Sequence, residues 1–298
     1  MRHRQAGKVC DGLWYLGREE SGVYYLKGRS GAVLISGGLA HILPDVLDQM
    51  KSFGLDPGFL TSIVILHSHF DHVGVVPYFK RTWPAVEICA SAPAWSILSM
   101  PKAVGVANTF SLMAAKMAKA EGGLAGYDYE WRDDVRGTTL KQGDRIDVGG
   151  FSLEIHETPG HSSCSITAYE PGLKALFASD AVGIPYRDIL FPSANSSMAQ
   201  YLESLEKLRP LPLAIVGADH YGYVTGEEAA GFIDASAVEA RKLDAEMREI
   251  LRSRGGDVEA AAKAMNALFF ERCSDYFIAP EILEGVFKQM MKHIAKSA

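Results

Sequence analysis

Three histidines and an aspartate fall within six consecutive residues, His67-Ser68-His69-Phe70-Asp71-His72. They come directly after residues 61–66, a β-branched apolar run typical of a strand that is buried on both faces. Imidazoles that crowd one another at a strand end disfavour each other's charged forms, whereas neutral metal-bound forms are natural there. The segment therefore predicts a metal site, in the loop position where layered α/β folds gather their ligands.

Three further candidate ligands follow other predicted strands. They are His161, after a hairpin predicted at 144–157; Asp180, after a strand predicted at 175–178; and His220, after a strand predicted at 213–216. Each lies close to a glycine or another small residue, which leaves the backbone free to aim a side chain. Each could be structural if taken alone, but the set supplies the donors that two metal ions need.

The order of predicted elements indicates two parts. Short apolar and aromatic runs at 13–16, 23–26 and 32–35 predict strands, and helical spacing of apolar residues follows at 42–53. We expect a catalytic domain at 1–225 that contains a helical insertion at about 100–126, and a helical C-terminal extension at 226–298. A surface helix packed on the core is the simpler interpretation of the insertion, but it could also form a lid over a pocket through Phe110, Leu112, Met113 and Met117.

The composition of the chain limits the kinds of binding partner that it can have. The net charge is −6 and no long Lys/Arg run occurs, which argues against nucleic acid as a partner. No apolar run approaches the roughly 20 residues of a membrane span, and the N-terminus lacks the apolar core of a signal peptide. The four cysteines are scattered, as is typical of free thiols in a reducing compartment. We therefore expect a cytoplasmic protein that binds neither nucleic acid nor membranes.

The H-x-H-x-D-H motif, the Gly-His after a hairpin, the isolated Asp and the late His together resemble the metallo-β-lactamase superfamily over residues 10–222. The resemblance implies an α+β fold, an αββα sandwich with the site at one edge of its two sheets. It implies that His67, His69 and His161 hold one divalent ion, that Asp71, His72 and His220 hold a second, and that Asp180 bridges them. Zinc, iron and manganese all suit such donors. The superfamily often has Asp-x-Gly where this chain has Ser36-Gly37-Gly38. This difference puts in doubt the hydrogen bonds that usually orient the ligand side chains.

The resemblance also bears on activity. Two ions that share a water lower its pKa toward about 7, and the resulting hydroxide can attack a carbonyl; Asp71 or Asp180 could relay its proton. Aspartate at 180, where many zinc β-lactamases have cysteine, argues against that activity, and histidine at 69 argues against the flavin-linked diiron reductases. Persulfide dioxygenases need only one iron, whereas this chain has seven candidate ligands. RNA-processing members carry extra nucleic-acid modules, whereas this chain is short and acidic. Both activities are therefore disfavoured.

What remains is hydrolysis of a small acyl substrate. The chain resembles the quinolone-signal response thioesterases, which act on 2-aminobenzoylacetyl-coenzyme A, in pattern along most of its length, including Val75-Val-Pro-Tyr-Phe79 and the helical tail. That resemblance implies cleavage of an acyl thioester, with tail helices that cover the site and make homodimer contacts. The alternatives are a lactonase or hydroxyacylglutathione hydrolase-like enzyme, and a metal-binding regulator that docks a partner through its tail with weak catalysis.

Some polar residues have two interpretations. Asp219 could orient the neighbouring His220 imidazole or be an ordinary loop residue. Arg132, Arg136 and Lys141 could meet coenzyme phosphates, although a solvated charged loop is the simpler interpretation.

Overall fold

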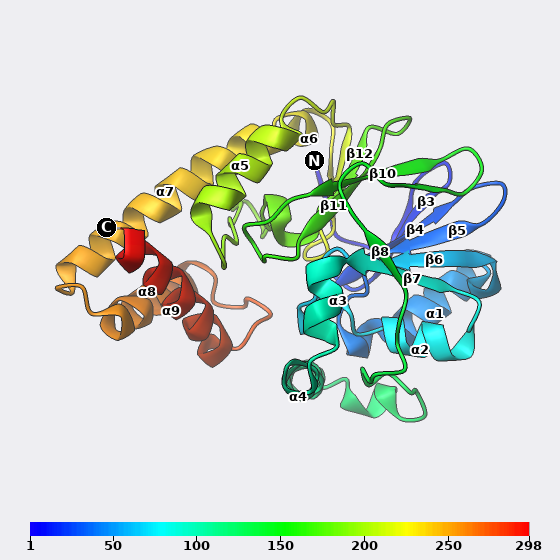
Figure 1. Ribbon diagram of the computed structural model, residues 1–298, viewed down its shortest axis with the longest axis horizontal. Helices are drawn as coiled ribbons and strands as arrows, with labels where there is room; N and C mark the ends of the chain where they lie inside the picture. The colour runs from blue at the N-terminus through cyan, green and yellow to red at the C-terminus, as the bar shows by residue number, and fades with distance from the viewer. Residues whose placement is uncertain (298) are drawn as a thin grey trace.

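Two seven-stranded β-sheets pack face to face, with helices on both outer faces (Figure 1). This computed structural model describes residues 1–297. In order across the first sheet, the strands are β2 (Gly7–Cys10), β3 (Leu13–Gly17), β4 (Gly22–Lys27), β5 (Ala32–Ile35), β6 (Leu60–Val64), β7 (Glu87–Ser91) and β8 (Thr138–Leu140). Across the second sheet they are β1 (Arg2–His3), β14 (Tyr223–Thr225), β13 (Ile215–Gly217), β12 (Ala175–Phe177), β11 (Ile166–Glu170), β10 (Ser152–Glu157) and β9 (Arg145–Asp147).

The helices fall into three sets. Those on the outer side of the first sheet are α1 (Leu43–Ser52), α2 (Val76–Thr82) and α3 (Ala92–Leu98), and α4 (Pro101–Met117) follows them. Those beside the second sheet are α5 (Met198–Leu208) and α6 (Glu227–Ala230). The tail contains α7 (Phe232–Ser253), α8 (Val258–Arg272) and α9 (Pro280–Ser297).

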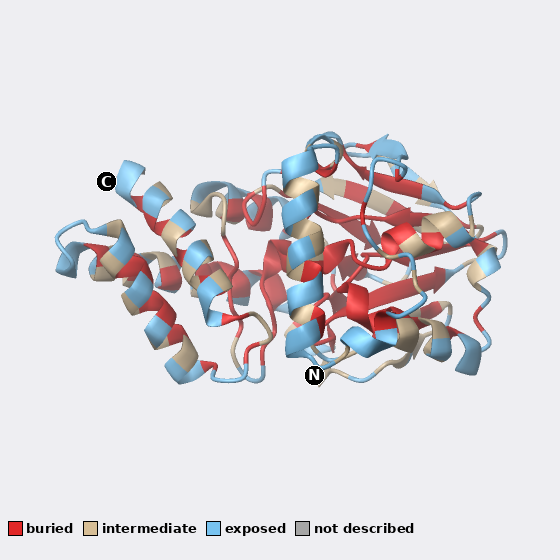
Figure 2. Ribbon diagram, turned by 90° about the horizontal axis from the view of Figure 1, so that it is seen from below, coloured by how far each residue is buried: buried red, intermediate tan, exposed pale blue. Residues whose placement is uncertain are grey.

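Strand β4 shows why the layers stack in this way. Tyr24 and Leu26 pack between the two sheets, whereas Val23 and Tyr25 pack in the cluster that contains α1, α2 and α3. A strand that is buried on both faces reads as a nearly unbroken apolar run, which is the pattern of this segment. Figure 2 shows the buried residues concentrated in the sheets and on the inward sides of the helices.

The layer order confirms the predicted α+β class with αββα layers. The sequence did not predict β8 or β14, which have three residues each, nor helices α2 and α3, which have seven each. Segments this short carry too little hydrophobic periodicity to be recognised from one sequence. Their pairing with neighbouring strands and packing on the sheet stabilise them instead.

The helical tail is joined to the second sheet by a common hydrophobic cluster. Val216 and Val224 of that sheet belong to the same buried cluster as Phe232, Phe269 and Phe287 of the tail. In Figure 1 the tail extends to the left of the sheets, and α4 lies below, between the tail and the sheets. Within residues 1–297, no helix is long and apolar enough to cross a membrane.

Candidate metal centre

The seven predicted ligands lie in four loops that each follow a strand. The loop after β6 contains His67, His69, Asp71 and His72, the last two in a short 3-10 turn at Phe70–His72. The other loops follow β10, β12 and β13 and contain His161, Asp180 and His220 respectively. Because β6 belongs to one sheet and the other three strands to the second, the site is at the edge where the sheets meet.

Close packing fixes the loop that contains His161. Gly160 has a φ of +138°, and a Cβ there would lie 2.3 Å from the backbone nitrogen of Tyr201 in α5. Only glycine tolerates both the backbone conformation and the approach of the helix. The backbone N–H groups of Ser196 and Ser197 both donate to the Gly160 carbonyl at 3.0 Å. The contact with α5 and these two hydrogen bonds fix the backbone directly before His161.

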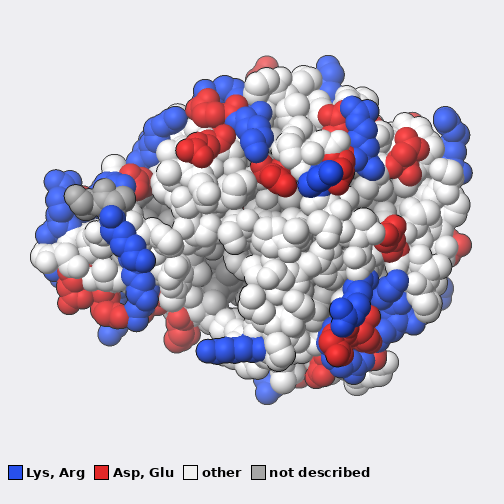
Figure 3. Space-filling view, in the orientation of Figure 1, with Lys and Arg blue, Asp and Glu red and all other residues white. Residues whose placement is uncertain are grey.

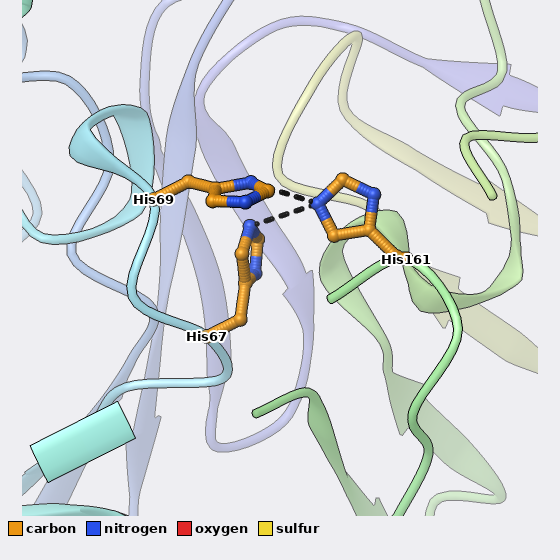
Figure 4. Close-up of side chains that lie close together, drawn as sticks. All are labelled: His67, His69 and His161. Atoms are coloured by element: carbon orange, nitrogen blue, oxygen red, sulfur yellow. Dashed lines mark hydrogen bonds between the residues drawn. The ribbon is translucent and has the colours of Figure 1, made fainter. Parts of the chain in front are cut away.

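A first group of ligands consists of His67, His69 and His161 (Figure 4). The Nε2 atom of His161 lies 3.2 Å from His67 Nε2 and 3.0 Å from His69 Nδ1. The three rings stand nearly edge to face, with ring centroids 4.6–4.7 Å apart. The nitrogen atoms therefore converge on one small volume.

A second group consists of Asp71, His72 and His220. His220 Nε2 lies 3.1 Å from His72 Nε2 and 3.4 Å from Asp71 Oδ2. All three residues are buried. The group thus combines two imidazoles with a carboxylate, whereas the first group has imidazoles alone.

Asp180 lies between the two groups. Its Oδ2 atom is 3.4 Å from His161 Nε2 and 4.0 Å from His67 Nε2 on one side, and 3.3 Å from His72 Nε2 on the other. Its Oδ1 atom is 3.7 Å from His220 Nε2. One carboxylate is therefore within reach of both groups, as a bridging ligand requires.

The donors fit divalent metal ions. In each group the ligand atoms lie within 4.8 Å of one another. Asp180 Oδ1 is buried and has no hydrogen-bond partner among residues 1–297, although buried polar atoms nearly always have one. Imidazole nitrogen and carboxylate oxygen are the donors that zinc, iron and manganese accept. The seven residues therefore fit the predicted divalent metal site.

Backbone carbonyl groups orient two of the histidines. His161 Nδ1 donates to the Ser193 carbonyl oxygen at 2.7 Å, and His220 Nδ1 donates to the Glu20 carbonyl oxygen at 2.6 Å. A histidine that donates through Nδ1 presents the Nε2 lone pair, which is the form that binds a metal. No sequence signal pointed to either partner, because a main-chain carbonyl is present at every residue.

Asp219 orients His72, which corrects the interpretation that it orients its neighbour His220. His72 Nδ1 donates to Asp219 Oδ2 at 2.7 Å, and Ser36 Oγ donates to the same oxygen at 2.5 Å. Ser36 stands where the superfamily often has aspartate, so a serine–aspartate pair supplies the hydrogen bond behind His72. Ser179, next to Asp180, adds a hydroxyl 3.0 Å from the same Nδ1. Ser36 and Ser179 both have left-handed backbone conformations, which cluster at functional sites.

Burial holds the first group neutral. It lowers the pKa of His67 well below the ordinary value, and the neighbouring imidazoles of His72 and His161 lower it further. The pKa of His69 falls to about 4, mainly through burial and then through His161. Burial also lowers the pKa of His161, against the opposing effect of Asp180. At neutral pH these imidazoles have lone pairs free for a metal.

Carboxylates change the charge of the second group. Burial alone would lower the pKa of His72, but Asp71 and Asp180 outweigh it and raise this pKa well above the ordinary value. The pKa of His220 is raised for the same reason, chiefly by Asp180 against burial. Burial favours a high pKa for Asp71, yet His72 and His220 lower it to about 2. The carboxylates thus favour the protonated forms of His72 and His220, in contrast to the histidines of the first group.

An apolar cavity of about 530 Å³ opens above the ligands. Its floor includes His69, Asp71, His161, Asp180 and His220. One wall is α4, with Val106 and Phe110 among its residues, and the opposite wall is the tail, with Tyr276, Phe277, Ile282, Leu283 and Val286. Figure 3 shows a hollow, lined mostly by uncharged atoms, where the tail meets the sheets. The insertion therefore forms a wall of the cavity, but of the residues predicted for a lid only Phe110 lines it, whereas Met113 and Met117 are exposed and lie outside the lining.

The tail touches one of the candidate ligands directly. The Phe277 ring stacks on His220, with centroids 4.2 Å apart and an interplanar angle of 29°. No sequence signal pointed to this contact, because the two positions lie in different predicted parts of the chain, far apart in number. By contrast, Arg132, Arg136 and Lys141 are exposed and none lines the cavity; Arg132 pairs with Asp128 at 2.5 Å, as a solvated charged loop would.

The family model described as metallo-beta-lactamase superfamily matches residues 16–220. The chain therefore belongs to the metallo-β-lactamase superfamily, whose members are mostly metal-dependent hydrolases. It is 24% identical over 205 residues to a metallo-β-lactamase fold-containing protein of Sulfurisphaera tokodaii, covering 68% of this chain and 73% of that protein. It is 34% identical over 126 residues to a hydroxyacylglutathione hydrolase of Hahella chejuensis, covering 39% of this chain and 45% of that enzyme. A solved structure of a metallo-β-lactamase family protein from Thermus thermophilus covers 97% of this chain and 95% of its own, with a TM-score of 0.68 and 16% identity.

Proposed function

We propose that the protein binds two divalent metal ions and hydrolyses an acyl thioester of the acyl-coenzyme A type. The observation that carries the proposal is the pair of ligand groups joined by Asp180 at the floor of an apolar cavity. Two adjacent ions would supply Lewis acidity and a water of lowered pKa. The cavity would supply the apolar surroundings that an acyl chain prefers to water.

The two carboxylates serve as ligands and as acceptors. The histidines around Asp71 and Asp180 lower the pKa of both carboxyl groups, so both are ionised at neutral pH. Asp180 faces both groups and can accept a hydrogen bond from an attacking water between them. Asp71 lies within the second group, where its Oδ2 atom faces His220 Nε2. We assign both residues to the catalytic site on this basis.

Two observations support a thioester as the substrate. The hydroxyacylglutathione hydrolase relative is a thioester hydrolase by name, although its match spans less than half of that enzyme. The walls from α4 and the tail suit a larger apolar acyl group, as in the quinolone-signal response thioesterases that the sequence resembles. A lactone and a glutathione thioester remain the alternative substrates. A homodimer through the C-terminal helices and a docking role for the tail remain predictions.

The test is thiol release from a panel of acyl-coenzyme A and acyl-glutathione thioesters, with lactones assayed beside them. The protein is assayed as purified, after chelation, and after reloading with zinc, iron or manganese. We expect metal-dependent release with a preference for apolar acyl groups. Asp180→Asn should abolish turnover while the circular dichroism spectrum stays unchanged.

The exposed pair Arg209–Asp234 offers a matched control, because Asp234→Asn makes the same chemical change at a residue that does not line the cavity. Undiminished thioester turnover in Asp180→Asn would falsify the proposed role of this carboxylate. Lactone cleavage without thioester cleavage would replace the thioester with the alternative substrate.

A further inference from the structure

Among the described residues that line the cavity, Lys102 is the only lysine or arginine. The other charged or titratable side chains there are Asp71, Asp180 and the histidines of the metal centre, together with Tyr276. Lys102 lies in the first turn of α4 and is exposed to solvent. Within residues 1–297 its ammonium group makes no ion pair or hydrogen bond. In the part of the chain that the structure describes, a single free cation therefore lies in an otherwise apolar wall.

The helix sets the distance from this cation to the reacting centre. Phe110, near the middle of α4, makes an edge-to-face contact with Phe70, with ring centroids 5.5 Å apart. Phe70 lies between His69 and Asp71 in the sequence, so Phe110 is the residue of α4 that lies beside the candidate ligands. Lys102 precedes Phe110 by eight residues, which at 1.5 Å per residue is about 12 Å along the helix axis. The residues between them that line the cavity, Ala103, Val106 and Ala107, are all apolar.

We propose that Lys102 binds an anionic group of the substrate, a carboxylate or phosphate, roughly 12 Å from the carbonyl that is cleaved. The inference rests on the proposed thioesterase function. Such an anion can come from either side of the thioester. A nucleotide-bearing thiol such as coenzyme A carries phosphates beyond its long thiol arm, and a long acyl chain can end in a carboxylate. Lys102 is thus a specificity-determining residue that touches the substrate far from the bond that breaks.

Four thioesters distinguish the two sources. A neutral medium-chain acyl group and the same chain ending in a carboxylate are each attached to coenzyme A and to uncharged N-acetylcysteamine. The variants are Lys102→Gln, which removes the charge, and Lys102→Arg, which retains it. Lys116→Gln is the matched control, because Lys116 is an exposed lysine of the same helix that does not line the cavity. Both positions are on the helix surface, so the fold should survive each substitution.

We expect Lys102→Gln to raise KM roughly tenfold for the thioesters that carry the recognised anion, with kcat little changed, since one charge-assisted contact far from the reacting carbonyl is lost. Lys102→Arg should restore most of this loss, and Lys116→Gln should change nothing. An effect on both coenzyme A thioesters places the anion in the leaving group, and an effect on both ω-carboxyl thioesters places it in the acyl chain. The doubly neutral thioester should be unaffected in every variant.

An equal effect of Lys102→Gln on all four thioesters, or no effect on any, overturns the inference and leaves the proposed function standing. If no thioester is hydrolysed, the proposed function fails, and equilibrium binding of coenzyme A and of a medium-chain dicarboxylate to the metal-loaded protein decides the inference. Binding that Lys102→Gln weakens and Lys102→Arg restores supports it. Binding of equal strength in wild type and Lys102→Gln, or no binding, contradicts it.

Discussion

The two groups of candidate ligands lie side by side but differ in the charge of their histidines. Burial and neighbouring imidazoles lower the pKa values of His67, His69 and His161 against the opposing effect of Asp180, so these imidazoles are neutral. His72 and His220 face carboxylates, which raise their pKa values. The first group is therefore ready for a metal at neutral pH, whereas a metal at the second group must displace protons. The neighbours of a histidine, and not the motif it belongs to, therefore determine its charge.

The groups also differ in their support. Carbonyl oxygens of Ser193 and Glu20 orient one histidine in each group. Among residues 1–297, only the second group has a buried carboxylate behind a ligand, the Asp219 partner of His72, which Ser36 holds in turn. Changes at this pair should therefore act on one group and spare the other.

The largest expected effect comes from His69→Ala. Loss of a ligand should lower activity by more than the roughly 10–100-fold that loss of a hydrogen-bond partner behind a ligand costs. Mass spectrometry should show that the metal bound by the first group is lost. Metal binding at the second group should still depend on Asp219. His156→Ala, a half-buried histidine outside the site, is the control. Full metal content in His69→Ala would show that the first group is wrongly assigned.

Asp219→Asn should weaken metal binding at the second group by roughly 10–100-fold. The amide keeps the shape but loses the charge that holds the His72 imidazole. Titration with a competing chelator should show one weakened and one unchanged binding step. Equal weakening of both steps would contradict the separation of the two groups, and Asp234→Asn controls for the loss of an acidic residue in general.

Metal binding at the second group should strengthen as pH rises, by about tenfold per pH unit for each proton displaced. The sign follows from the raised pKa values of His72 and His220, because each holds a proton below its folded-state pKa and releases it above. The first group has lowered pKa values, about 4 for His69, and should bind with little change between about pH 6 and pH 8. Chelator competition at three pH values measures both slopes. If metal affinity changed equally with pH at both groups, the proposed difference in the charge of their histidines would be refuted.

The smallest effect is expected from Ser36→Ala. It removes one hydrogen bond to Asp219, worth about 1 kcal/mol, and should weaken the second group about fivefold. Serine and alanine tolerate the left-handed backbone about equally, so the bond is the main change. Ser52→Ala, on the exposed surface of α1, is the comparison variant. A loss as large as that of Asp219→Asn would mean that Ser36 acts through more than this bond.

The sequence predicted the layered fold, and the seven candidate ligands that it predicted lie together in the structure. The candidate ligands were recognisable because each follows a segment that predicts a strand, and strand ends of a layered fold converge. The partners behind them were not recognisable in the same way. Asp219 was interpreted either as the partner of its neighbour His220 or as an ordinary loop residue, yet it bonds to His72, which is 147 residues away in the chain. Adjacent residues in a loop point to different sides, so sequence proximity does not determine which of them share a contact.

The identity and order of the ligands, the layers that position them and the superfamily are therefore written in the chain itself, because they depend on local residue types and on the alternation of buried strands. The charges of the two groups, the Ser36–Asp219 pair, the stacking of Phe277 on His220 and the placement of Lys102 in the cavity wall depend on contacts between distant segments. Such contacts arise only when the two sheets, α4 and the tail pack together. Burial and neighbouring charge, which set each pKa, exist only in that packed state.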